Sequence, residues 1–551
     1  MKKTADRRDL VLPGLLVSLA LCFMLFIYAP YELYLTNPGE FWFSVKQMLP
    51  YTLALFAAGT ALCAAALFLA ARFFPPRICS LLTAVLLFAL IAFYLQGNFL
   101  VAGLPGLDGT EFDRNAYPAQ RLLSGLCWGG SAVIVFLLFI KTKGRLFSRL
   151  AVFLGGGSAL LMLLTLAGLF IVNGKSEDKV LAYTNAHLLD FSKEENFIIL
   201  HLDAVDPYVF ESVLSEAPEY RKAYEDFTYF DNTMSGYPYT KCSIPLILTG
   251  KWYEAKGDFN AWVNDAIADS PIFSQLSVQN YQLGLYDLDN FLLSEKKLGG
   301  MFENTCRKDL VITSKVEMAK TILRMAIIKY FPWDLKEVGY RVQNTMYGFR
   351  AVRSANGEDC YFWDNILFYE RLNEPGAIRV RPEKTFKYIE LKGGHTPFST
   401  GKDVSYDPNA TYFTCVEASM KIVARTIELM KENNVYENAV IVVLSDHGFL
   451  SEGNEPYHRQ HSVLMIKGRG ERHDFSVNHA PLSHADLCEG FVRLLDGATG
   501  DSCFDWQPGQ SRERRFLGYD CYHLDRFEEY IQTGLAQEAD TMTLTGRIFT
   551  P

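Results

Sequence analysis

Five long apolar runs in the first third of the chain constrain its fold more than any other feature. They are Leu10–Tyr28, Leu49–Ala71, Ile78–Leu95, Leu123–Ile140 and Leu150–Val172. Each is close to the roughly 20 residues that a helix needs to cross a bilayer, and none carries a charge in its interior. One run alone would fit a signal peptide or a buried core helix. Five of them predict a transmembrane bundle, and the first has no small-residue cleavage site, so we expect it to be retained.

The charges that flank these runs predict their orientation. Basic residues gather at the amino terminus and in the second and fourth connections: Lys2, Lys3, Arg7, Arg8, Arg72, Arg77, Lys141, Lys143, Arg145 and Arg149. The first and third connections are mainly acidic. By the positive-inside rule the amino terminus is cytoplasmic. Five crossings then place the rest of the chain outside, so the sequence predicts a multi-pass protein of the cell membrane with an extracytoplasmic domain.

The net charge divides at the same point. The 551 residues carry a net charge of −9, and residues 1–175, with 14 Lys/Arg and 7 Asp/Glu, contribute +7, which leaves −16 on the remainder. We therefore predict two domains, a transmembrane domain over 1–175 and an extracytoplasmic domain over 176–551. The acidic balance argues against nonspecific nucleic-acid binding. Because no ionisable residue lies at mid-membrane, the bundle is expected to anchor the protein and hold a lipid substrate rather than to transport.

After residue 190, short apolar strands alternate with amphipathic helices. The predicted strands are Phe197–Leu202, Leu283–Tyr286, Phe386–Leu391, Ala439–Leu444 and Ser462–Ile466, and Cys415–Glu432 is a predicted helix. This alternation is typical of an α/β domain with a mainly parallel central sheet. The run AVIVVL is as apolar as a central strand covered on both faces. Ligands of such sheets bind beyond the carboxyl ends of the strands, so polar residues that follow the strands are candidate site residues.

Several polar side chains stand at these strand ends. Asp203 follows the first strand, His395 follows the strand over 386–391, and Asp446 and His447 follow AVIVVL. His458 and His461 come within 15 residues of Asp446, and Thr240 precedes an apolar helix-like stretch. An aspartate after a strand is often only a helix cap. Carboxylates and imidazoles that converge at several strand ends, however, suit a divalent metal such as zinc or manganese. A hydroxyl beside that metal would be a nucleophile.

These motifs resemble the alkaline phosphatase/sulfatase superfamily, and most closely its membrane-anchored branch of lipoteichoic acid synthases and lipid A phosphoethanolamine transferases. The resemblance rests on SDHG after an apolar strand, on NFIILHLD about 240 residues earlier, and on T-x-x-S-x-P between them. It also rests on the five apolar runs, and it covers most of the chain. It implies a sulfatase-like fold and a metal-dependent enzyme.

The resemblance also implies roles for individual residues. Asp203, Asp446, His447 and the Thr240 oxygen match the ligands of one divalent ion, manganese or zinc. Thr240 matches the nucleophilic threonine, and His395 resembles a histidine that contacts the transferred phosphoryl group. His458 resembles the second such histidine, with His461 as the competing choice because the loop length differs by about a residue.

Two departures limit what is carried over. Sulfatases mature a Cys or Ser in C/S-x-P-x-R, but Cys242 is followed by Ser-Ile-Pro-Leu, which makes sulfate-ester hydrolysis a weaker expectation and Cys242 a packing residue. Asp203 stands where the transferases have glutamate.

The expected function is that of a phosphotransferase. It would move a phosphoglycerol or phosphoethanolamine head group from a membrane phospholipid to a glycan or glycolipid of the cell envelope, through a phosphothreonine. A phosphodiester or sulfate-ester hydrolase and an inactive sulfatase-like scaffold or sensor are the alternatives. The oligomeric state is left open.

One further segment has two interpretations. Residues Val316–Tyr330 form an amphipathic pattern with basic residues opposite apolar ones. This pattern fits either a helix on the bilayer surface that guides lipid head groups, or an ordinary helix packed on the α/β domain.

Overall fold

The computed structural model divides into two compact units. It describes residues 7–36, 43–104, 112–142, 145–173, 180–287, 293–307, 311–337, 352–354, 356–449, 459–520 and 523–551. The first unit comprises Met1–Glu177 and Lys308–Gly357, and the second comprises Asp178–Arg307 and Glu358–Pro551. The segment 308–357, which we expected to lie within the second domain, therefore groups with the first unit.

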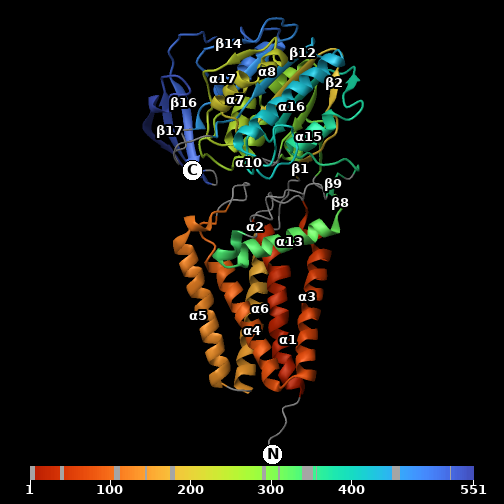
Figure 1. Ribbon diagram of the computed structural model, residues 1–551, viewed down its shortest axis with the longest axis vertical. Helices are drawn as coiled ribbons and strands as arrows, with labels where there is room; N and C mark the ends of the chain where they lie inside the picture. Colours follow the sequence, from red (N-terminus) through yellow and green to blue (C-terminus); the bar gives the residue numbers. More distant parts are fainter. Residues whose placement is uncertain are drawn as a thin grey trace, which may run out of the picture. The chain divides into compact units, whose positions relative to one another are not determined.

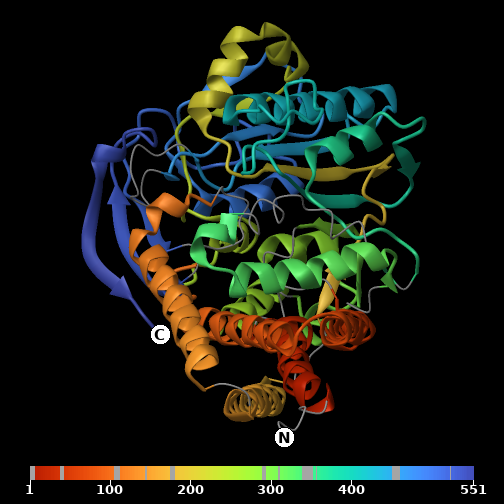
Figure 2. The ribbon, with the colours of Figure 1, turned by 60° about the horizontal axis from the view of Figure 1, so that its bottom comes forward.

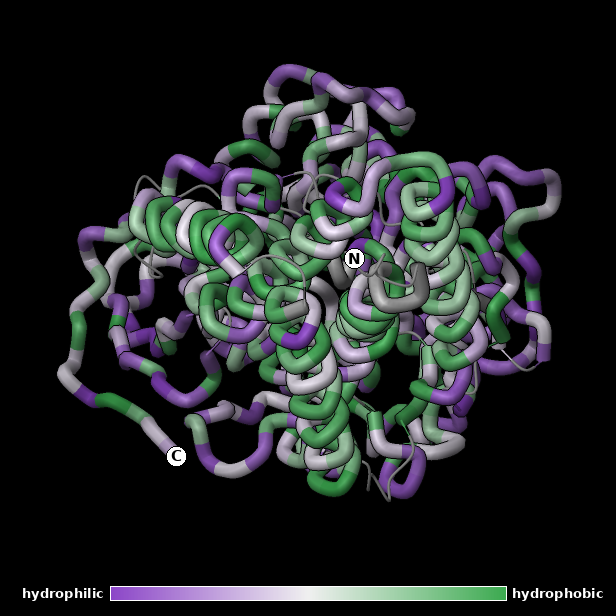
Figure 3. The backbone as a smooth tube through the Cα atoms, turned by 90° about the horizontal axis from the view of Figure 1, so that it is seen from below, coloured by the Kyte–Doolittle hydropathy of each residue, from purple (hydrophilic) through white to green (hydrophobic). Residues whose placement is uncertain are grey.

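Five apolar helices build the first unit, as predicted. The first span comprises α1 (Arg7–Phe23), the π-helical turn η1 (Met24–Tyr28) and α2 (Ala29–Thr36). The others are α3 (Val45–Phe73), α4 (Pro76–Phe99), α5 (Pro118–Thr142) and α6 (Arg145–Asn173). All five are long and apolar enough to cross a membrane, and apolar residues run along them in the end-on view of Figure 3. Each is longer than the apolar run that predicted it, because helical hydrogen bonding continues into the polar flanks.

Helix α13 (Lys315–Tyr330) lies across the ends of α3 and α4 in the same unit (Figure 1). Lys329 pairs with Glu32 of α2, and the Tyr330 ring packs where Gly97 of α4 has no side chain. In the following turn η4 (Trp333–Leu335), the Trp333 indole Nε1–H donates to the Leu100 carbonyl at 2.8 Å. The amphipathic segment thus packs on the apolar helices, and the interpretation as a helix packed on the α/β domain is wrong.

A seven-stranded, mainly parallel sheet forms the centre of the second unit, which confirms the predicted fold class. Its order is β14-β4-β13-β12-β3-β11-β6, and β12, β3, β11 and β6 are parallel neighbours. The four central strands in this order are β13 (Leu464–Lys467), β12 (Ala439–Leu444), β3 (Asn196–Leu202) and β11 (Thr385–Leu391). The outer ones are β14 (Ser476–Asn478), β4 (Thr228–Phe230) and β6 (Gln282–Tyr286). Every residue of β3, β11 and β12 is buried, as expected for strands covered on both faces.

Helices cover this sheet in two groups. One group is α9 (Thr240–Thr249), α10 (Phe259–Ala268), α11 (Pro271–Val278) and α17 (His484–Leu495). It packs on the sheet through ring contacts of Phe491 with Phe197 and of Phe273 with Phe386. The other group is α7 (Pro207–Glu216), α8 (Pro218–Ala223), α15 (Asn365–Leu372) and α16 (Tyr412–Glu432), and α16 runs alongside the strands in Figure 2.

Smaller elements complete the two units. The antiparallel sheet β16 (Arg514–Asp520), β17 (His523–Gln532) and β18 (Met542–Phe549) lies at one edge of the second unit (Figure 2). The remaining elements are β1 (Leu181–Tyr183), β2 (Asp190–Ser192), β5 (Thr233–Met234), α12 (Glu295–Leu298), β7 (Thr305–Arg307), β8 (Val311–Ile312), β9 (Val352–Arg353), β10 (Arg379–Arg381), β15 (Leu482–Ser483), and the 3-10 turns η3 (Arg114–Ala116) and η7 (Ala539–Thr541).

Candidate metal and nucleophile site

The register of the three central parallel strands brings their carboxyl ends to one edge. Leu202 of β3 pairs with Leu391 of β11, and His201 pairs with Leu444 of β12. Asp203 follows β3, and the pair Asp446-His447 follows β12, so these side chains meet. The loop after β11 approaches closely because Gly393 has a φ of 55° and a Cβ there would overlap the Asp203 backbone.

Thr240 joins the same site from helix α9. Its hydroxyl Oγ1 donates to Asp203 Oδ1 at 3.3 Å and lies 3.4 Å from His447 Nε2. Thr240 is the first residue of α9, and the preceding Tyr239 gives no side-chain cap to the helix. The positive end of the helix dipole therefore lies at the hydroxyl, where it favours an anion. The structure thus brings together Asp203, Thr240, Asp446 and His447, the four residues carried over from the resemblance.

The donor atoms of His447 and Asp446 fit a cation. Nδ1 of His447 lies 2.8 Å from the Gly448 carbonyl and must donate its proton there, so Nε2 presents a lone pair. This lone pair lies 3.2 Å from Asp446 Oδ2, a buried oxygen that has no hydrogen-bond partner among the described residues. Two acceptors that face each other without a proton repel, and a metal ion between them would remove this repulsion.

The pKa values of the site follow from burial and from the paired carboxylates. Burial lowers the pKa of His447 to about 4 although the Asp446 carboxylate acts in the opposite direction, so the imidazole is neutral at pH 7, as a metal ligand must be. Burial and the Asp446 charge raise the pKa of Asp203 well above its ordinary value. Burial acts the same way on Asp446, but the neighbouring histidines outweigh it and hold its pKa low. Without a metal, Asp203 is therefore the carboxyl that holds a proton.

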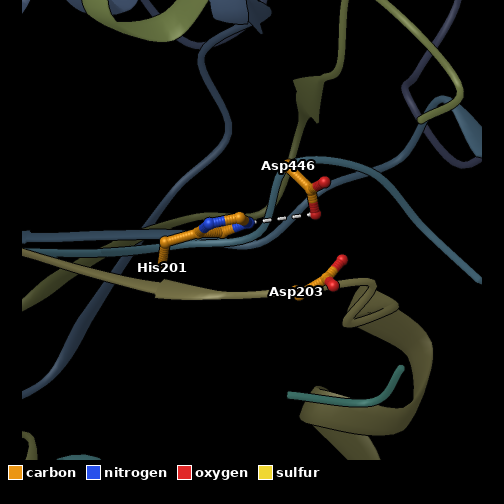
Figure 4. Close-up of side chains that lie close together, drawn as sticks. All are labelled: His201, Asp203 and Asp446. Atoms are coloured by element: carbon orange, nitrogen blue, oxygen red, sulfur yellow. Dashed lines mark ion pairs between the residues drawn. The ribbon is translucent and has the colours of Figure 1, made fainter. Parts of the chain in front are cut away.

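His201 is a site residue that the sequence did not reveal. Ligand atoms of His201, Asp203 and Asp446 all lie within 4.8 Å of one another (Figure 4). Its Nε2 lies 3.1 Å from Asp446 Oδ1, at ion-pair distance but without good hydrogen-bond geometry, and its Nδ1 lies 3.0 Å from the Tyr388 hydroxyl. The Ala204 backbone N–H donates to the same Oδ1 at 3.1 Å. Together these contacts hold Oδ1 and leave Oδ2 directed at the site.

The other predicted histidines differ in their surroundings. His395 is half-buried, its Nδ1 lies 2.6 Å from the Thr396 carbonyl, and its ring packs edge-on against Trp363 with centroids 5.1 Å apart. Its charge acts on the pKa of His447, so it lies beside the site. His461 Nε2 lies 2.8 Å from the Asp231 backbone carbonyl, a contact typical of a structural histidine. His458 lies outside the described residues.

Comparison with known proteins shows which family the sequence of the second unit matches. A family model described as Sulfatase matches residues 195–498, more than half of the chain. A search of curated proteins found no match. Similar solved structures include Ps i-CgsB (15% identity, TM-score 0.42, covering 65% of this chain and 86% of that one). They also include the phosphonate monoester hydrolase SpPMH from Silicibacter pomeroyi (13%, 0.35, 63% and 88%) and the lipoteichoic acid synthase LtaP from Listeria monocytogenes (10%, 0.35, 62% and 85%).

Proposed function

Since this chain belongs to the sulfatase family, we propose that it is a membrane-anchored, metal-dependent phosphotransferase. Its donor is a membrane phospholipid, its product is a phosphoglycerol- or phosphoethanolamine-modified glycan or glycolipid of the cell envelope, and it works through a phosphothreonine. The observation that carries the proposal is the contact of the Thr240 hydroxyl with Asp203 and His447 in a chain that also has five membrane-length helices. The proposed reaction does not involve nucleic acid.

The lipid donor follows from the anchor. An enzyme with five membrane-length helices meets bilayer lipids continuously, whereas a soluble substrate needs no such anchor. The basic residues of the amino terminus and of the second and fourth connections support a cytoplasmic amino terminus. The second unit would then be extracytoplasmic, where the glycans and glycolipids of the envelope are found.

The residues of the site divide the reaction into two displacements. In the first, Thr240 Oγ1 attacks phosphorus and its proton leaves along the hydrogen bond that Asp203 accepts. The bond from phosphorus to the lipid oxygen breaks, and the lipid alcohol leaves with a proton from His395 or His458. In the second, a hydroxyl of the acceptor attacks phosphorus and the same histidine takes its proton. The bond from phosphorus to Thr240 Oγ1 breaks, and Thr240 recovers its proton from Asp203.

Four groups would hold the divalent cation: Asp203, Asp446, His447 and Thr240 Oγ1. When bound, manganese or zinc supplies Lewis acidity that stabilises the threonine alkoxide and the phosphoryl oxygens. His201 supports the set from behind, because it contacts the Asp446 oxygen that faces away from the site.

Hydrolysis is the second candidate function, and it differs only in that water is the acceptor. The nucleophile distinguishes phosphodiester hydrolysis from sulfate-ester hydrolysis. Cys242 is fully buried within α9 and lacks the maturation motif, whereas Thr240 is half-buried at the start of the helix. A phosphodiesterase is therefore favoured over a sulfatase.

The decisive experiment is mass spectrometry of the Thr240 peptide after the purified protein is incubated with phospholipid vesicles. A mass increase of one phospho-alcohol on Thr240 is expected, and its value identifies the head group. Thr240→Ala should abolish turnover, while Thr240→Ser retains a hydroxyl and should keep part of it. Normal activity of Thr240→Ala would refute the nucleophile. If the purified protein binds no metal and has no activity on a nitrophenyl phosphodiester, a non-catalytic scaffold is the better interpretation.

A further inference from the structure

Arg459 lies beside the site, and its guanidinium contacts two aromatic rings. Within the part of the chain that the structure describes, its guanidinium makes no hydrogen bond or ion pair. Its backbone is fixed instead, because the Gly448 N–H donates to the Arg459 carbonyl at 2.9 Å and the Ser235 hydroxyl donates to it at 3.2 Å. A fixed backbone and a cation that no described residue pairs with are what a ligand-binding arginine requires.

Two aromatic rings hold the guanidinium. Its Cζ lies 4.9 Å from the ring centroid of Tyr239 and 5.6 Å from that of Phe449. Phe449 is itself stacked on Tyr412, with ring centroids 4.9 Å apart. Such cation–π contacts restrain the planar group without using its N–H donors, so the donors remain available to an anion.

These contacts place the Arg459 guanidinium beside Thr240 and His447. Tyr239 immediately precedes Thr240, and its ring centroid lies 6.2 Å from that of His447. Burial and Asp446 raise the pKa of Asp203, and the Arg459 charge opposes them. The same charge adds to the effect of burial on His447. The Arg459 charge therefore acts on Asp203 and His447, the two groups that contact the Thr240 hydroxyl.

The charge balance of the site calls for such a group. A divalent cation is neutralised by the two carboxylates of Asp203 and Asp446, so the negative oxygens of a transferred group need a further cation. Lys392 also interacts with the Asp203 charge, but its ammonium donates to the Pro397 carbonyl at 2.6 Å and is already engaged. Arg459 has no such contact with any residue that the structure describes.

We propose that Arg459 is a catalytic residue that binds the non-bridging oxygens of the tetrahedral oxyanion during its transfer to and from Thr240. This deepens the proposed function, on which the identity of the group rests. A planar fork that spans two oxygens of one phosphoryl group also explains why an arginine, and not a lysine, suits this position.

The test separates anion binding from turnover. Metal-loaded, full-length protein with Thr240→Ala is titrated with inorganic phosphate by calorimetry, and the same is done with Thr240→Ala combined with Arg459→Lys. The combined variant should bind phosphate at least about tenfold more weakly with unchanged metal content. Arg515→Lys is the matched control, because Arg515 also lies between two rings, Trp252 and Phe549, but pairs with Glu254 and Glu529.

Kinetics gives the second measurement. In protein with Thr240 intact, Arg459→Lys should lower kcat on a nitrophenyl phosphodiester by about 10²-fold or more, and Arg459→Ala should be partly rescued by added guanidinium ion. Equal phosphate affinity of the two Thr240→Ala proteins would overturn the proposal and assign Arg459 to loop packing. The binding result holds whatever Thr240→Ala does to turnover, so a failure of the nucleophile and a failure of Arg459 are distinguishable. If Arg459→Ala does not fold, the lysine variant still decides.

Discussion

Tyr388→Phe tests whether His201 serves the metal site or only fills the core. Tyr388 is fully buried, and its hydroxyl lies 3.0 Å from His201 Nδ1. If Tyr388 donates to Nδ1, His201 carries its proton on Nε2, which lies 3.1 Å from Asp446 Oδ1. Removing the hydroxyl removes the reason for this tautomer. The other tautomer turns a lone pair toward the carboxylate, which then loses its fixed orientation.

The expected effect has two parts. Loss of one buried hydrogen bond, with Nδ1 left unsatisfied, should cost about 1–3 kcal/mol of the free energy of unfolding. Loss of the outer contact that orients a ligand should weaken metal binding about 10- to 100-fold, equivalent to about 1.4–2.7 kcal/mol. Chemical denaturation of metal-free protein measures the first, and calorimetric titration with zinc or manganese measures the second.

Tyr224→Phe is the control for this experiment. Tyr224 is also fully buried, and its hydroxyl donates to the Met420 carbonyl of α16 at 2.7 Å. It should lose similar stability and leave metal affinity unchanged. If Tyr388→Phe behaves in the same way as Tyr224→Phe, the chain from Tyr388 through His201 to Asp446 has no role in metal binding.

Three other perturbations test separate features. Because burial and the Asp446 charge raise the pKa of Asp203, the metal-free protein should lose stability as the pH rises from the ordinary aspartate pKa through the raised one. Metal binding in that pH range should release a proton, and Asp203→Asn should abolish this release. Calorimetry in buffers of different ionisation enthalpy detects the released proton. Gly393→Ala combines a positive φ with overlap on Asp203 and should cost about 2–4 kcal/mol by denaturation, against about 1 kcal/mol for Gly376→Ala, where the φ is also positive but the space is open. Trp333→Ala should cost about 3–5 kcal/mol in detergent because the indole is fully buried, whereas Leu335→Ala, 49% exposed, should cost little.

The strand-end residues could be predicted because their positions depend on a simple rule. Asp203, Asp446 and His447 each follow an apolar run, and parallel strands bring their carboxyl ends to one edge. The register of β3 with β11 and β12 then meets that expectation residue by residue. Thr240 needed the family resemblance, because a threonine before an apolar stretch has no distinctive pattern of its own.

His201 and Arg459 could not be predicted in this way. A single histidine in FIILHL looks like a tolerated core residue, and only the pairing of β3 with its neighbours shows that it faces Asp446. Strand alternation does place residues 201 and 203 on one face, and this was the one available signal. The position of Arg459 depends on rings from two other segments, which no local spacing encodes.

The docking of α13 illustrates the same limit and bears on the lipid substrate. Its amphipathic pattern predicted a helix with one apolar face but carried no information on which surface that face would meet. The structure assigns it to the apolar helices, so the chain passes between the two units near residues 177, 307 and 357. Three covalent connections restrict the separation of the two units more than a single connection would. If the donor is a membrane lipid, as we propose, this restriction raises the effective concentration of the site at the bilayer.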